Sequence, residues 1–388
     1  MNVLHIVNSY GGTDVYTNLY TSIDLNANIT QRVYVPLNNR NHDRVGKKMI
    51  DFKNRESNIH YATVLKGYHK YLYGSKISTI VKDIERTIEL DKVDVIHAGM
   101  MCLDGAAAYE LHKKHGIPYI VAVRSTDIFF YYRKLFWRKS YFTKILLNAE
   151  KIVFISPKYK ELFLENYVPK NYLSLIGQKM LVMPNGVNEY FLKNRNLDEH
   201  KLTEDFRLIF VSGFFARKGL VETINAVERL RSKGLHISVN AIGKGLPDRP
   251  LEQEYIRKVE ELSNGKTWVK LQPFKKADEV MREMRSSDAF IMVSSNETFG
   301  LVYVEALTQG LPIIYAKNEG IDGFYPEGFV GFSAQAGNVD SIADAIEKLI
   351  CEYSSLSKNV NSLDLDKDFE WNTIAKKYLE LYNKILQK

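Results

Sequence analysis

The sequence predicts an α/β protein made of two successive units, each a parallel sheet with helices on both faces. The first observation is an alternation of short apolar runs, typical of buried strands, with amphipathic stretches long enough to form helices. The second is a restart, because the same alternation begins again after a seam at about residues 175–206. The third is the length of 388 residues, which is more than one domain usually holds.

The first unit is predicted to open with a strand at residues 3–7 that enters a turn containing Gly11 and Gly12. A helix is predicted to follow, since apolar residues recur there at helical spacing: Val15, Leu19 and Ile23. Further strands are predicted at residues 32–36, 93–97, 118–123 and 151–155, separated by helices such as 105–115.

The second unit is predicted to begin after Pro184-Asn185-Gly186, which is a turn signal. Its strands are predicted at residues 207–211, 236–242, 269–272, 289–293, 313–315 and 330–332. Its helices are predicted at 219–232, 253–263, 279–285 and 340–353, with another opening near Thr298. A polar connection is predicted at 354–368, followed by a final helix at 369–386 with one apolar face: Ile374, Tyr378, Leu381 and Tyr382.

Composition excludes several classes of protein. Hydrophobic residues make up 45% and charged residues 26% of the chain, which is a globular balance and argues against disorder. Two cysteines, Cys102 and Cys351, are too few for a disulfide scaffold and indicate a reducing compartment. No apolar stretch approaches the ~20 residues of a membrane span, and the first residues lack the pattern of a signal peptide.

The net charge of +7 is divided unevenly between the halves of the chain. Residues 1–190 carry a net charge of +9, and residues 191–388 carry −2. A basic half suits an anionic partner such as nucleic acid, a membrane surface or a phosphorylated substrate. The alternative interpretation is a lysine-rich solvated surface.

Parallel α/β sheets bind ligands at the carboxyl ends of their strands, and four strand-to-helix turns stand out there. Gly11 and Gly12 would let a ligand approach the backbone, although they also suit an ordinary tight turn. This turn is not a G-x-G-x-x-G, which disfavours a Rossmann oxidoreductase. The turn after the strand at 118–123 places Arg124 and Asp127 at a candidate ligand edge.

The other two turns lie in the second unit. The turn at 212–219 holds Arg217 and Lys218 beside glycines, which suits a diphosphate or is simply an exposed basic turn. The turn at 297–305 has Glu297 before and Glu305 after a helix start, whose amides would form a seat for an anion. Carboxylates on both sides could hold the hydroxyls of a sugar and of a ribose. An acidic helix start would explain Glu297, but not Glu305 in an apolar stretch.

With these turns in place, the chain resembles the retaining, nucleotide-sugar-dependent glycosyltransferases of the large GT-B family 4, and the resemblance covers nearly all of it. Its most specific element is Glu297 to Glu305, which matches the family's E-x7-E. Other matches, in order, are Pro184 to Asn188, Lys218-Gly219, Gly243-Lys244-Gly245, Ser286 to Phe290 and Trp371 with the helix after it.

The resemblance implies a fold and a division of labour. The fold is GT-B: two Rossmann-like domains facing each other across a cleft, with a C-terminal helix returning to the first. Residues 1–180, with the helix 369–388, would form the N-terminal acceptor-side domain. Residues 181–368 would form the C-terminal domain, which binds the nucleotide sugar.

The resemblance also implies roles for single residues. Lys218 would bind the donor diphosphate, Glu305 the ribose hydroxyls, and Glu297 the donor sugar near the reacting carbon. Arg124 and Asp127 complete the candidate catalytic set. The remaining donor-binding candidates are Gly11, Gly12, Asn185, Gly213, Arg217, Gly243, Pro273, Phe274, Thr298, Phe299, Gly300 and Leu301.

Two positions depart from the family pattern. The family often has Arg where Gly213 stands, so either Arg217 replaces that cation from a neighbouring position or the charge is absent. It often has His where Arg124 stands. Because Arg stays ionised at neutral pH, Arg124 cannot shuttle a proton and would instead hold a sugar hydroxyl, a carboxylate or a phosphate.

The implied reaction moves a hexose or N-acetylhexosamine from a nucleoside-diphosphate sugar, with UDP expected, to a glycan acceptor in cell-surface polysaccharide or glycoconjugate synthesis. Anomeric configuration would be retained by same-face attack. No cofactor and no metal ion is expected, because the acidic D-x-D at Asp364-Leu365-Asp366 lies in the polar connection.

The acceptor is expected to be lipid-linked. Aromatic and basic residues interleave over 129–144, including Arg133, Lys134, Trp137, Arg138 and Lys139, and this mixture suits an anionic membrane surface. The alternative is a helix with a buried aromatic face and a solvated basic face. The expected location is cytoplasmic, peripheral on the inner face of the plasma membrane, with no nucleic-acid partner.

Two other functions remain as alternatives. One is a sugar-nucleotide epimerase on the same fold, against which the E-x7-E and its Lys-Gly partner favour transfer. The other is a non-enzymatic membrane- or nucleic-acid-binding protein that uses the basic half. That alternative leaves the acidic pair and the phosphate turn of the second half unexplained.

Overall fold

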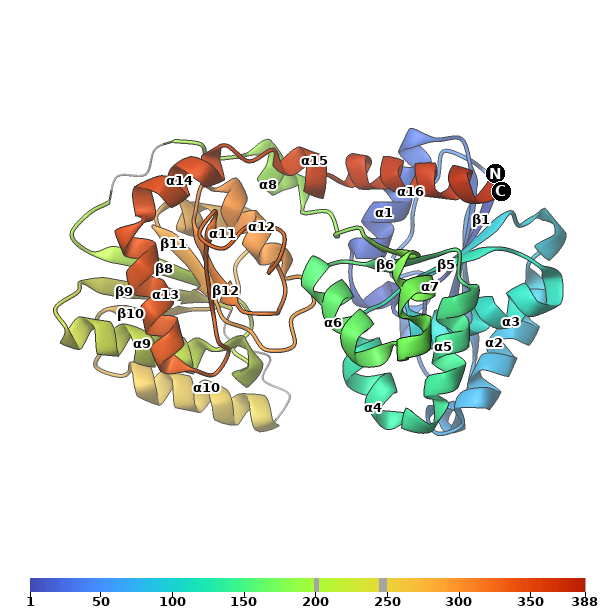
Figure 1. Cartoon of the computed structure of the whole chain (residues 1–388), viewed down its shortest axis with the longest axis horizontal. Coiled ribbons are helices and arrows are strands. Elements are labelled where there is room, and N and C mark those ends of the chain that lie inside the picture. The colour runs from blue at the N-terminus through green and yellow to red at the C-terminus, as the bar shows by residue number, and fades with distance from the viewer. Residues whose placement is uncertain (199–201, 244–249, 388) are drawn as a thin grey trace. The chain divides into compact units, whose positions relative to one another are not determined.

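The computed structural model describes residues 1–198, 202–243 and 250–387. By its contacts the chain falls into two units (Figure 1). Unit 1 comprises Met1–Ile155, Lys160–Gly186 and Trp371–Lys388, and unit 2 comprises Ser156–Tyr159 and Val187–Glu370. The predicted domain boundaries at 180/181 and 368/369 stay a prediction.

Unit 1 is built on a seven-stranded sheet in the order β3-β2-β1-β4-β5-β6-β7, in which every neighbouring pair is parallel. The strands are β1 (Asn2–Ile6), β2 (Thr30–Asn38), β3 (Asn58–Leu65), β4 (Val95–Ala98), β5 (Tyr119–Ala122), β6 (Lys151–Phe154) and β7 (Met180–Val182). The helices are α1 (Val15–Asn26), α2 (Tyr73–Thr87), α3 (Ala106–His115), α4 (Tyr132–Lys134), α5 (Lys139–Asn148), α6 (Pro157–Tyr167), α7 (Leu173–Gly177) and α16 (Trp371–Leu386). The first residues of α6, up to Tyr159, belong to unit 2.

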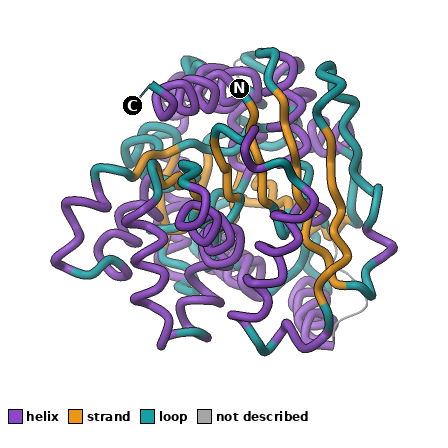
Figure 2. The backbone as a smooth tube through the Cα atoms, turned by 90° about the vertical axis from the view of Figure 1, so that its right-hand side faces the viewer, coloured by secondary structure: helices purple, strands orange, loops and turns teal. Residues whose placement is uncertain are grey.

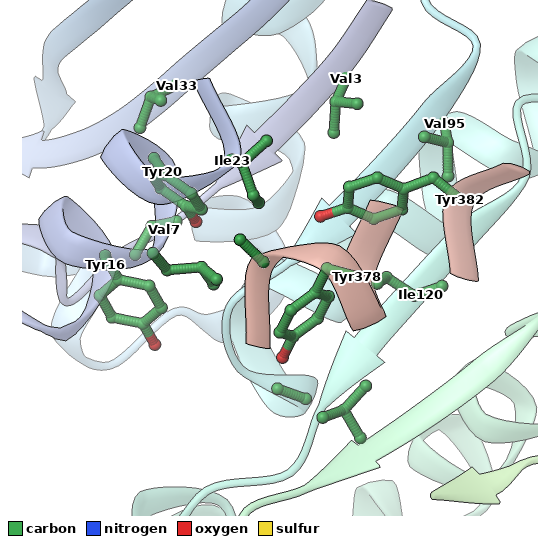
Figure 3. Close-up of a cluster of buried hydrophobic side chains, with 14 of the residues drawn as sticks. Val3, Val7, Tyr16, Tyr20, Ile23, Val33, Val95, Ile120, Tyr378 and Tyr382 are labelled. Carbon is green, nitrogen blue, oxygen red and sulfur yellow. The ribbon is translucent and has the colours of Figure 1, made fainter. Parts of the chain in front are cut away.

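The C-terminal helix α16 completes the core of unit 1, as the sequence predicts. Its apolar face packs on α1 and on the sheet, with Tyr378 and Tyr382 near Tyr16, Tyr20 and Ile23 (Figure 3). The Tyr382 hydroxyl lies 2.7 Å from His97 Nδ1 on β4, and the Tyr378 ring stacks on His97 with centroids 5.0 Å apart. This helix is distant in sequence, yet it supplies one wall of the first unit.

Unit 2 is built on a six-stranded parallel sheet in the order β10-β9-β8-β11-β12-β13. The strands are β8 (Phe206–Val211), β9 (Ile237–Ile242), β10 (Val269–Gln272), β11 (Ala289–Met292), β12 (Ile313–Ala316) and β13 (Gly331–Ala334). The helices are α8 (Glu189–Lys193), α9 (Leu220–Ser232), α10 (Pro250–Ser263), α11 (Ala277–Arg285), α12 (Leu301–Thr308), α13 (Val339–Cys351), α14 (Tyr353–Asn361) and α15 (Leu365–Phe369). Figure 2 faces unit 1, and there the strands run beside one another with helices flanking them.

The predicted α/β fold with two parallel sheets is therefore confirmed, with three local differences. β3 and β7 were not predicted. The stretch 354–368, predicted as a polar connection, contains most of α14 and all but the last residue of α15. The segment 129–144 is not one continuous helix, because short turns of different pitch interrupt it before α5 begins.

Candidate functional site

The sheet of unit 2 brings its two most informative turns together. Its strand order reverses between β8 and β11, which is the point where open parallel sheets usually bind ligands. The turn after β8 carries Arg217 and Lys218, and the turn after β11 carries Glu297. Neighbouring parallel strands end at the same edge, so these two turns meet.

Glycine permits the close meeting of the two turns. Gly219 has φ of 78°, in the left-handed region, and a Cβ there would lie 2.6 Å from the Val293 carbonyl oxygen. The Ser295 amide donates to the Arg217 carbonyl at 2.8 Å, which ties the turns directly. Lys218 is thus held at the end of a short 3-10 turn, Ala216–Lys218, facing the start of the next loop.

Lys218 and Glu297 form an ion pair. Their side chains are 10% and 16% exposed, so the pair is largely screened from water. Burial lowers the pKa of Lys218, and the nearby Glu297 carboxylate opposes that shift. Arg217 lies at the edge, with Nη1 3.8 Å from the same carboxylate and its side chain about half exposed. Two cations therefore converge on one acid.

The helix α12 begins beside this pair. Gly300 caps it with φ of 77°, and the first amides of a helix have no partner within that helix. Phe299 is buried against Phe324 and Phe369, which anchors the turn, while Thr298 and Leu301 are partly exposed. The result is a seat for an anion next to Lys218.

Glu305 lies in the second turn of α12 and has an unusual environment. Burial raises the pKa of its carboxyl to about 7, and no neighbouring charge or hydrogen bond among the described residues contributes to the shift. By solvent exposure Glu305 is partly buried, and an acid held in such a place without a partner costs the protein free energy. This cost is the reason to regard Glu305 as a ligand-binding group.

Three predicted donor-binding residues follow β9 and β10 directly: Gly243 after β9, and Pro273 and Phe274 after β10. Phe274 follows Pro273 directly after β10 and is 83% exposed, which is rare for a phenylalanine. Gly243 has φ of 117°, and a Cβ there would lie 2.5 Å from the Ser212 carbonyl oxygen, so glycine lets the turns after β8 and β9 touch. The predicted partners Lys244 and Gly245 lie outside the described residues.

Gly213 leaves space that the neighbouring Phe215 ring fills, with that ring 2.5 Å from where a Cβ would be. The Arg217 guanidinium lies 6.0 Å from the Phe215 ring centroid and 3.8 Å from Glu297. A cation is therefore present close to Glu297 although Gly213 carries none. Whether Arg217 does the work of the family's arginine stays a prediction.

In unit 1 the strand order reverses between β1 and β4. Gly11 and Gly12 follow β1, are exposed, and a Cβ on either would meet no atom within 4 Å. Arg124 follows β5, where its Nε donates to the Gly99 carbonyl at 3.3 Å and its guanidinium lies 5.9 Å from the Tyr16 ring. A glycine turn and a fixed arginine thus share the ligand edge of this sheet.

Asp127 is fully buried, and its carboxylate accepts hydrogen bonds from the backbone amides of Met101 (3.1 Å), Cys102 (2.7 Å) and Arg124 (2.8 Å). Because these bonds occupy the carboxylate away from solvent, the geometry favours a positioning role over direct contact with substrate. The Asp127 carboxylate joins the turn after β4 to the turn after β5, and so fixes the position of Arg124.

Sequence reasoning missed Asp104, which is fully buried at the same edge. One carboxylate oxygen accepts from the Asn8 amide at 3.1 Å, and the other has no hydrogen-bond partner among the described residues. Burial, and then the nearby Asp127 charge, raise the pKa of this carboxyl. The signal in the sequence is an acid within the apolar run 100–108.

Asn185 belongs to unit 1 and is half-buried. Its neighbour Gly186 packs on Trp371, since a Cβ at Gly186 would lie 2.4 Å from the indole ring. This contact fixes the predicted seam turn against the start of α16.

The basic and aromatic residues of 129–144 form a largely exposed surface. Phe130, Phe136 and Trp137 are 49%, 64% and 63% exposed, and Arg133, Lys134 and Lys139 are exposed beside them. Arg138 is half-buried, with its guanidinium 4.9 Å from the Tyr73 ring. Tyr132 and Phe142 of the same segment are 2% and 0% exposed, so only part of its aromatic side chains face solvent. Both interpretations, a membrane-facing surface and a buried aromatic face with a solvated basic face, therefore stay predictions.

Neither a metal cluster nor a membrane span is found in the described part of the chain. No three His, Cys, Asp or Glu side chains in residues 1–198, 202–243 and 250–387 group in a way that could hold a metal ion. Asp364 of the D-x-D caps α15, accepting from the Lys367 amide at 3.3 Å. Within the same residues, no helix has both the length and the apolar character needed to cross a membrane.

Residues 193–362 match the family model described as Glycosyl transferases group 1. An uncharacterized glycosyltransferase of Methanocaldococcus jannaschii, MJ1178, is 24% identical over 84% of this chain and 85% of its own length. Alpha-monoglucosyldiacylglycerol synthase of Acholeplasma laidlawii is 26% identical over 67% of each chain.

Solved structures agree on the fold. Sucrose-phosphate synthase from Thermosynechococcus elongatus superposes with a TM-score of 0.73 at 17% identity, over 100% of this chain and 99% of that one. Anabaena HepE in complex with UDP superposes with a TM-score of 0.70 at 14% identity, over 99% and 100%. Together the fold, the family model and the relatives make the chain a glycosyltransferase with a GT-B fold.

Proposed function

We propose that this glycosyltransferase is a retaining enzyme of the E-x7-E type that moves a hexose or N-acetylhexosamine from a UDP-sugar to a lipid-linked glycan acceptor. The observation that carries the proposal is the largely buried Lys218–Glu297 ion pair at the start of α12, together with Glu305, which has no partner in the second turn of that helix. A nucleoside-diphosphate sugar needs a cation and N–H donors for its diphosphate, and an acid each for its sugar and its ribose. Lys218, the first amides of α12, Glu297 and Glu305 are candidates for these parts.

The donor diphosphate takes the place of Glu297 as the partner of Lys218. In water-poor surroundings an ion pair is strong, so a ligand must offer a better one, and a diphosphate does so with more charge. Arg217 and the first amides of α12 add donors around the same seat. Glu297, released from Lys218, then accepts hydroxyls of the donor sugar.

The nucleoside end of the donor is held by different chemistry. Glu305 accepts the ribose hydroxyls, which gives a partner to an acid that otherwise has none. The exposed Phe274 ring offers a flat apolar face along the base. Anabaena HepE, which shares the fold, was solved in complex with UDP, and this supports UDP as the nucleotide.

Bond breaking leaves negative charge on the departing phosphate oxygen. Lys218, Arg217 and the α12 amides stabilise that charge in place, and stabilisation of this kind supplies most of the rate acceleration in many enzymes. The acceptor hydroxyl attacks from the face that the diphosphate leaves, its oxygen bonds to the anomeric carbon, and its proton passes to the departing phosphate oxygen. Configuration is thereby retained without a covalent enzyme intermediate, and neither a metal nor a cofactor enters any step.

The acceptor belongs to unit 1 in this proposal. Arg124 offers its remaining N–H donors to a hydroxyl or phosphate of the acceptor, while Gly11 and Gly12 stay candidates for the donor. The exposed basic and aromatic side chains of 129–139 suit an anionic membrane that carries the lipid, at the inner face of the plasma membrane. The Acholeplasma relative is named as a monoglucosyldiacylglycerol synthase, and this name supports a lipid acceptor.

A donor screen by nucleotide release tests the proposal, followed by Lys218→Ala and Glu305→Ala. Each variant should lose about 100-fold or more of its transfer rate, the size expected when a positioned charge is removed. Lys233→Ala, an exposed cation of unit 2, is the matched control and should stay near wild type. Near-normal turnover in both site variants would overturn the assignment.

Product analysis separates transfer from epimerisation. The wild-type protein is incubated with the sugar nucleotide found in the screen, with and without acceptor, and the products are resolved by chromatography. Transfer yields a free nucleoside diphosphate and a glycosylated acceptor. A changed sugar still attached to its nucleotide, formed without acceptor, would favour the epimerase instead.

A further inference from the structure

Glu319 lies in the loop after β12, outside every motif singled out from the sequence. Its Oε2 accepts a hydrogen bond from the Glu297 backbone amide at 2.8 Å and another from the Tyr159 hydroxyl at 2.9 Å. The next residue, Gly320, donates its amide to the Glu297 carbonyl at 2.6 Å. Both polar backbone groups of Glu297 are therefore held by residues 319 and 320.

Glu297 needs such support because of the residue before it. Asn296 has φ of 58°, in the left-handed region that costs a residue with a side chain roughly 1 kcal/mol or more. A strained turn persists only where its surroundings over-determine it. The hydrogen bonds that residues 319 and 320 make to the Glu297 backbone fix this turn directly after Asn296.

The Glu297 side chain is held separately, by Lys218. When Lys218 turns to a diphosphate, that hold is lost, and the backbone contacts remain. Glu319 does not join the ion pair itself, because its bonds run to a backbone amide and to Tyr159. Burial raises the pKa of the Glu319 carboxyl, and the Tyr159 hydroxyl and the amides it accepts from oppose that shift.

We infer that Glu319, held by Tyr159, is a positioning residue that keeps Glu297 directed at the donor sugar after the Lys218–Glu297 pair has opened. The inference rests on the proposed function, since it assigns a support to the acid placed at the donor sugar. It predicts that removal of Glu319 harms the chemical step and leaves nucleotide affinity intact, because Lys218, Glu305 and Phe274 hold the nucleotide independently.

The test compares Glu319→Ala with Glu319→Gln. The alanine variant loses the acceptor for the Glu297 amide, so kcat should fall at least 10-fold while the Kd for free UDP changes less than 2-fold. The glutamine variant keeps a carbonyl oxygen for both bonds, so it should recover most of kcat. Tyr159→Phe removes one of the two bonds and should fall between them.

Glu327→Ala is the matched control. Glu327 also bonds a backbone amide, that of Ser333 at 2.9 Å, and a tyrosine hydroxyl, that of Tyr315 at 3.2 Å, in the same unit. Its hydrogen bonds among the described residues go to Ser333 and Tyr315, not to Glu297. A loss of kcat as large in Glu327→Ala as in Glu319→Ala would mean a general structural effect and would overturn the inference.

Amide hydrogen exchange gives a readout that needs no activity. A peptide covering residues 294–300 should exchange faster in Glu319→Ala and Tyr159→Phe than in wild type, and at the wild-type rate in Glu319→Gln. Unchanged exchange in both weakened variants would refute the support role even if no donor were ever found. Absence of transfer in the wild type, with exchange as expected, would instead refute the proposed function alone.

Discussion

At the residue scale, Glu305 shows how a group that we propose to bind the donor can lower the stability of the protein that carries it. Its carboxyl has a pKa near 7 because burial disfavours the charged form. Below about pH 4.5 the group is neutral in both the folded and the unfolded chain, so it has no effect on stability. As pH rises from about 4.5 to 7, the unfolded chain ionises first, and the folded state loses stability relative to it.

Glu305→Gln should therefore be more stable than wild type at high pH and similar to it near pH 4.5. The gain at pH 8 should be about 3 kcal/mol, from a shift of about two and a half pKa units. Melting temperatures of both proteins at pH 5 and pH 8 measure the difference. The same variant should bind free UDP more weakly.

The outcome that contradicts this prediction is a stability difference between the two proteins that does not change with pH.

Single residues were predictable from the sequence where they stand in ordered motifs. Lys218 and Glu297 are 79 residues apart, yet the strand pattern predicts that their turns share one sheet edge, and the structure pairs them. Asp104 and Glu319 were not predictable, because their importance lies in single contacts, such as the bond from Glu319 to an amide 22 residues earlier. No local pattern encodes such a contact.

At the element scale, strands with continuous apolar runs were predictable, and the others were not. β3 is an edge strand in which His60 and Thr63 interrupt the apolar pattern, and most of its residues are only partly buried. α14 has buried Tyr353, Leu356 and Val360 at helical spacing. The serines and the asparagine between them make the stretch polar in composition, which led to the prediction of a connection. Tertiary packing decided both cases.

Gly219→Ala should disrupt the turn that delivers Lys218. The backbone there has φ of 78°, and the added Cβ would lie 2.6 Å from the Val293 carbonyl oxygen, so strain and collision act together. We expect a lower melting temperature, from a loss well above the roughly 1–2 kcal/mol of left-handed strain alone. Transfer activity should fall with it, because Lys218 is the preceding residue.

Gly265→Ala isolates the strain from the collision. Gly265 has φ of 74°, and a Cβ there would meet no atom within 4 Å. Its melting temperature should therefore fall less than that of Gly219→Ala. Equal losses in the two variants would show that the contact with Val293 is unimportant.

The buried histidines against which α16 packs should make the stability of unit 1 sensitive to acid. Burial, and then the Arg124 charge, lower the pKa of His97 to about 3, and burial also lowers the pKa of the neighbouring His5. A depressed histidine pKa gives stability that is present above about pH 6.5 and is lost as pH falls toward the folded-state value. His97→Asn removes one titrating group and keeps an oxygen that can accept from Tyr382.

Melting temperatures from pH 7.5 to pH 5 check this prediction. The wild-type protein should lose stability steeply with acid, by up to about 1.4 kcal/mol per pH unit for each such histidine, and His97→Asn less steeply. His42→Asn, an exposed histidine of the same unit, should keep the wild-type slope. Identical slopes in all three proteins would refute a buried neutral His97.

At the scale of the whole molecule, the charge divides between the units more sharply than between the halves of the sequence. Unit 1 carries 29 Lys and Arg against 17 Asp and Glu, and unit 2 carries 24 against 29. The helix α16 adds to the basic excess of unit 1, which a division at residue 190 conceals. The donor binding that we propose for unit 2 would thus depend on a few positioned cations, and the bulk positive charge belongs to the other unit.

The exposed basic–aromatic surface of unit 1 comprises Phe130, Arg133, Lys134, Phe136, Trp137 and Lys139. Tyr71 and Leu72, which sequence reasoning missed, are 79% and 55% exposed just before Tyr73, the residue on which Arg138 lies. Clustered apolar side chains in contact with water are unfavourable unless something covers them. Here cations surround them, so an anionic lipid surface is the cover that we propose.

Reversal of charge on this surface tests that proposal against bulk attraction. Arg133→Glu with Lys134→Glu should weaken binding to phosphatidylglycerol vesicles by more than about 30-fold, because each basic residue near such a surface contributes about 1 kcal/mol and each new glutamate is repelled by it. Lys53→Glu with Arg55→Glu changes the net charge of unit 1 equally at positions elsewhere, and should weaken binding less than 2-fold. Vesicle flotation at two salt concentrations measures both, and the wild-type affinity should fall as salt rises. If the two double variants lose affinity equally, the attraction comes from net charge alone and the surface at 130–139 has no special part in it.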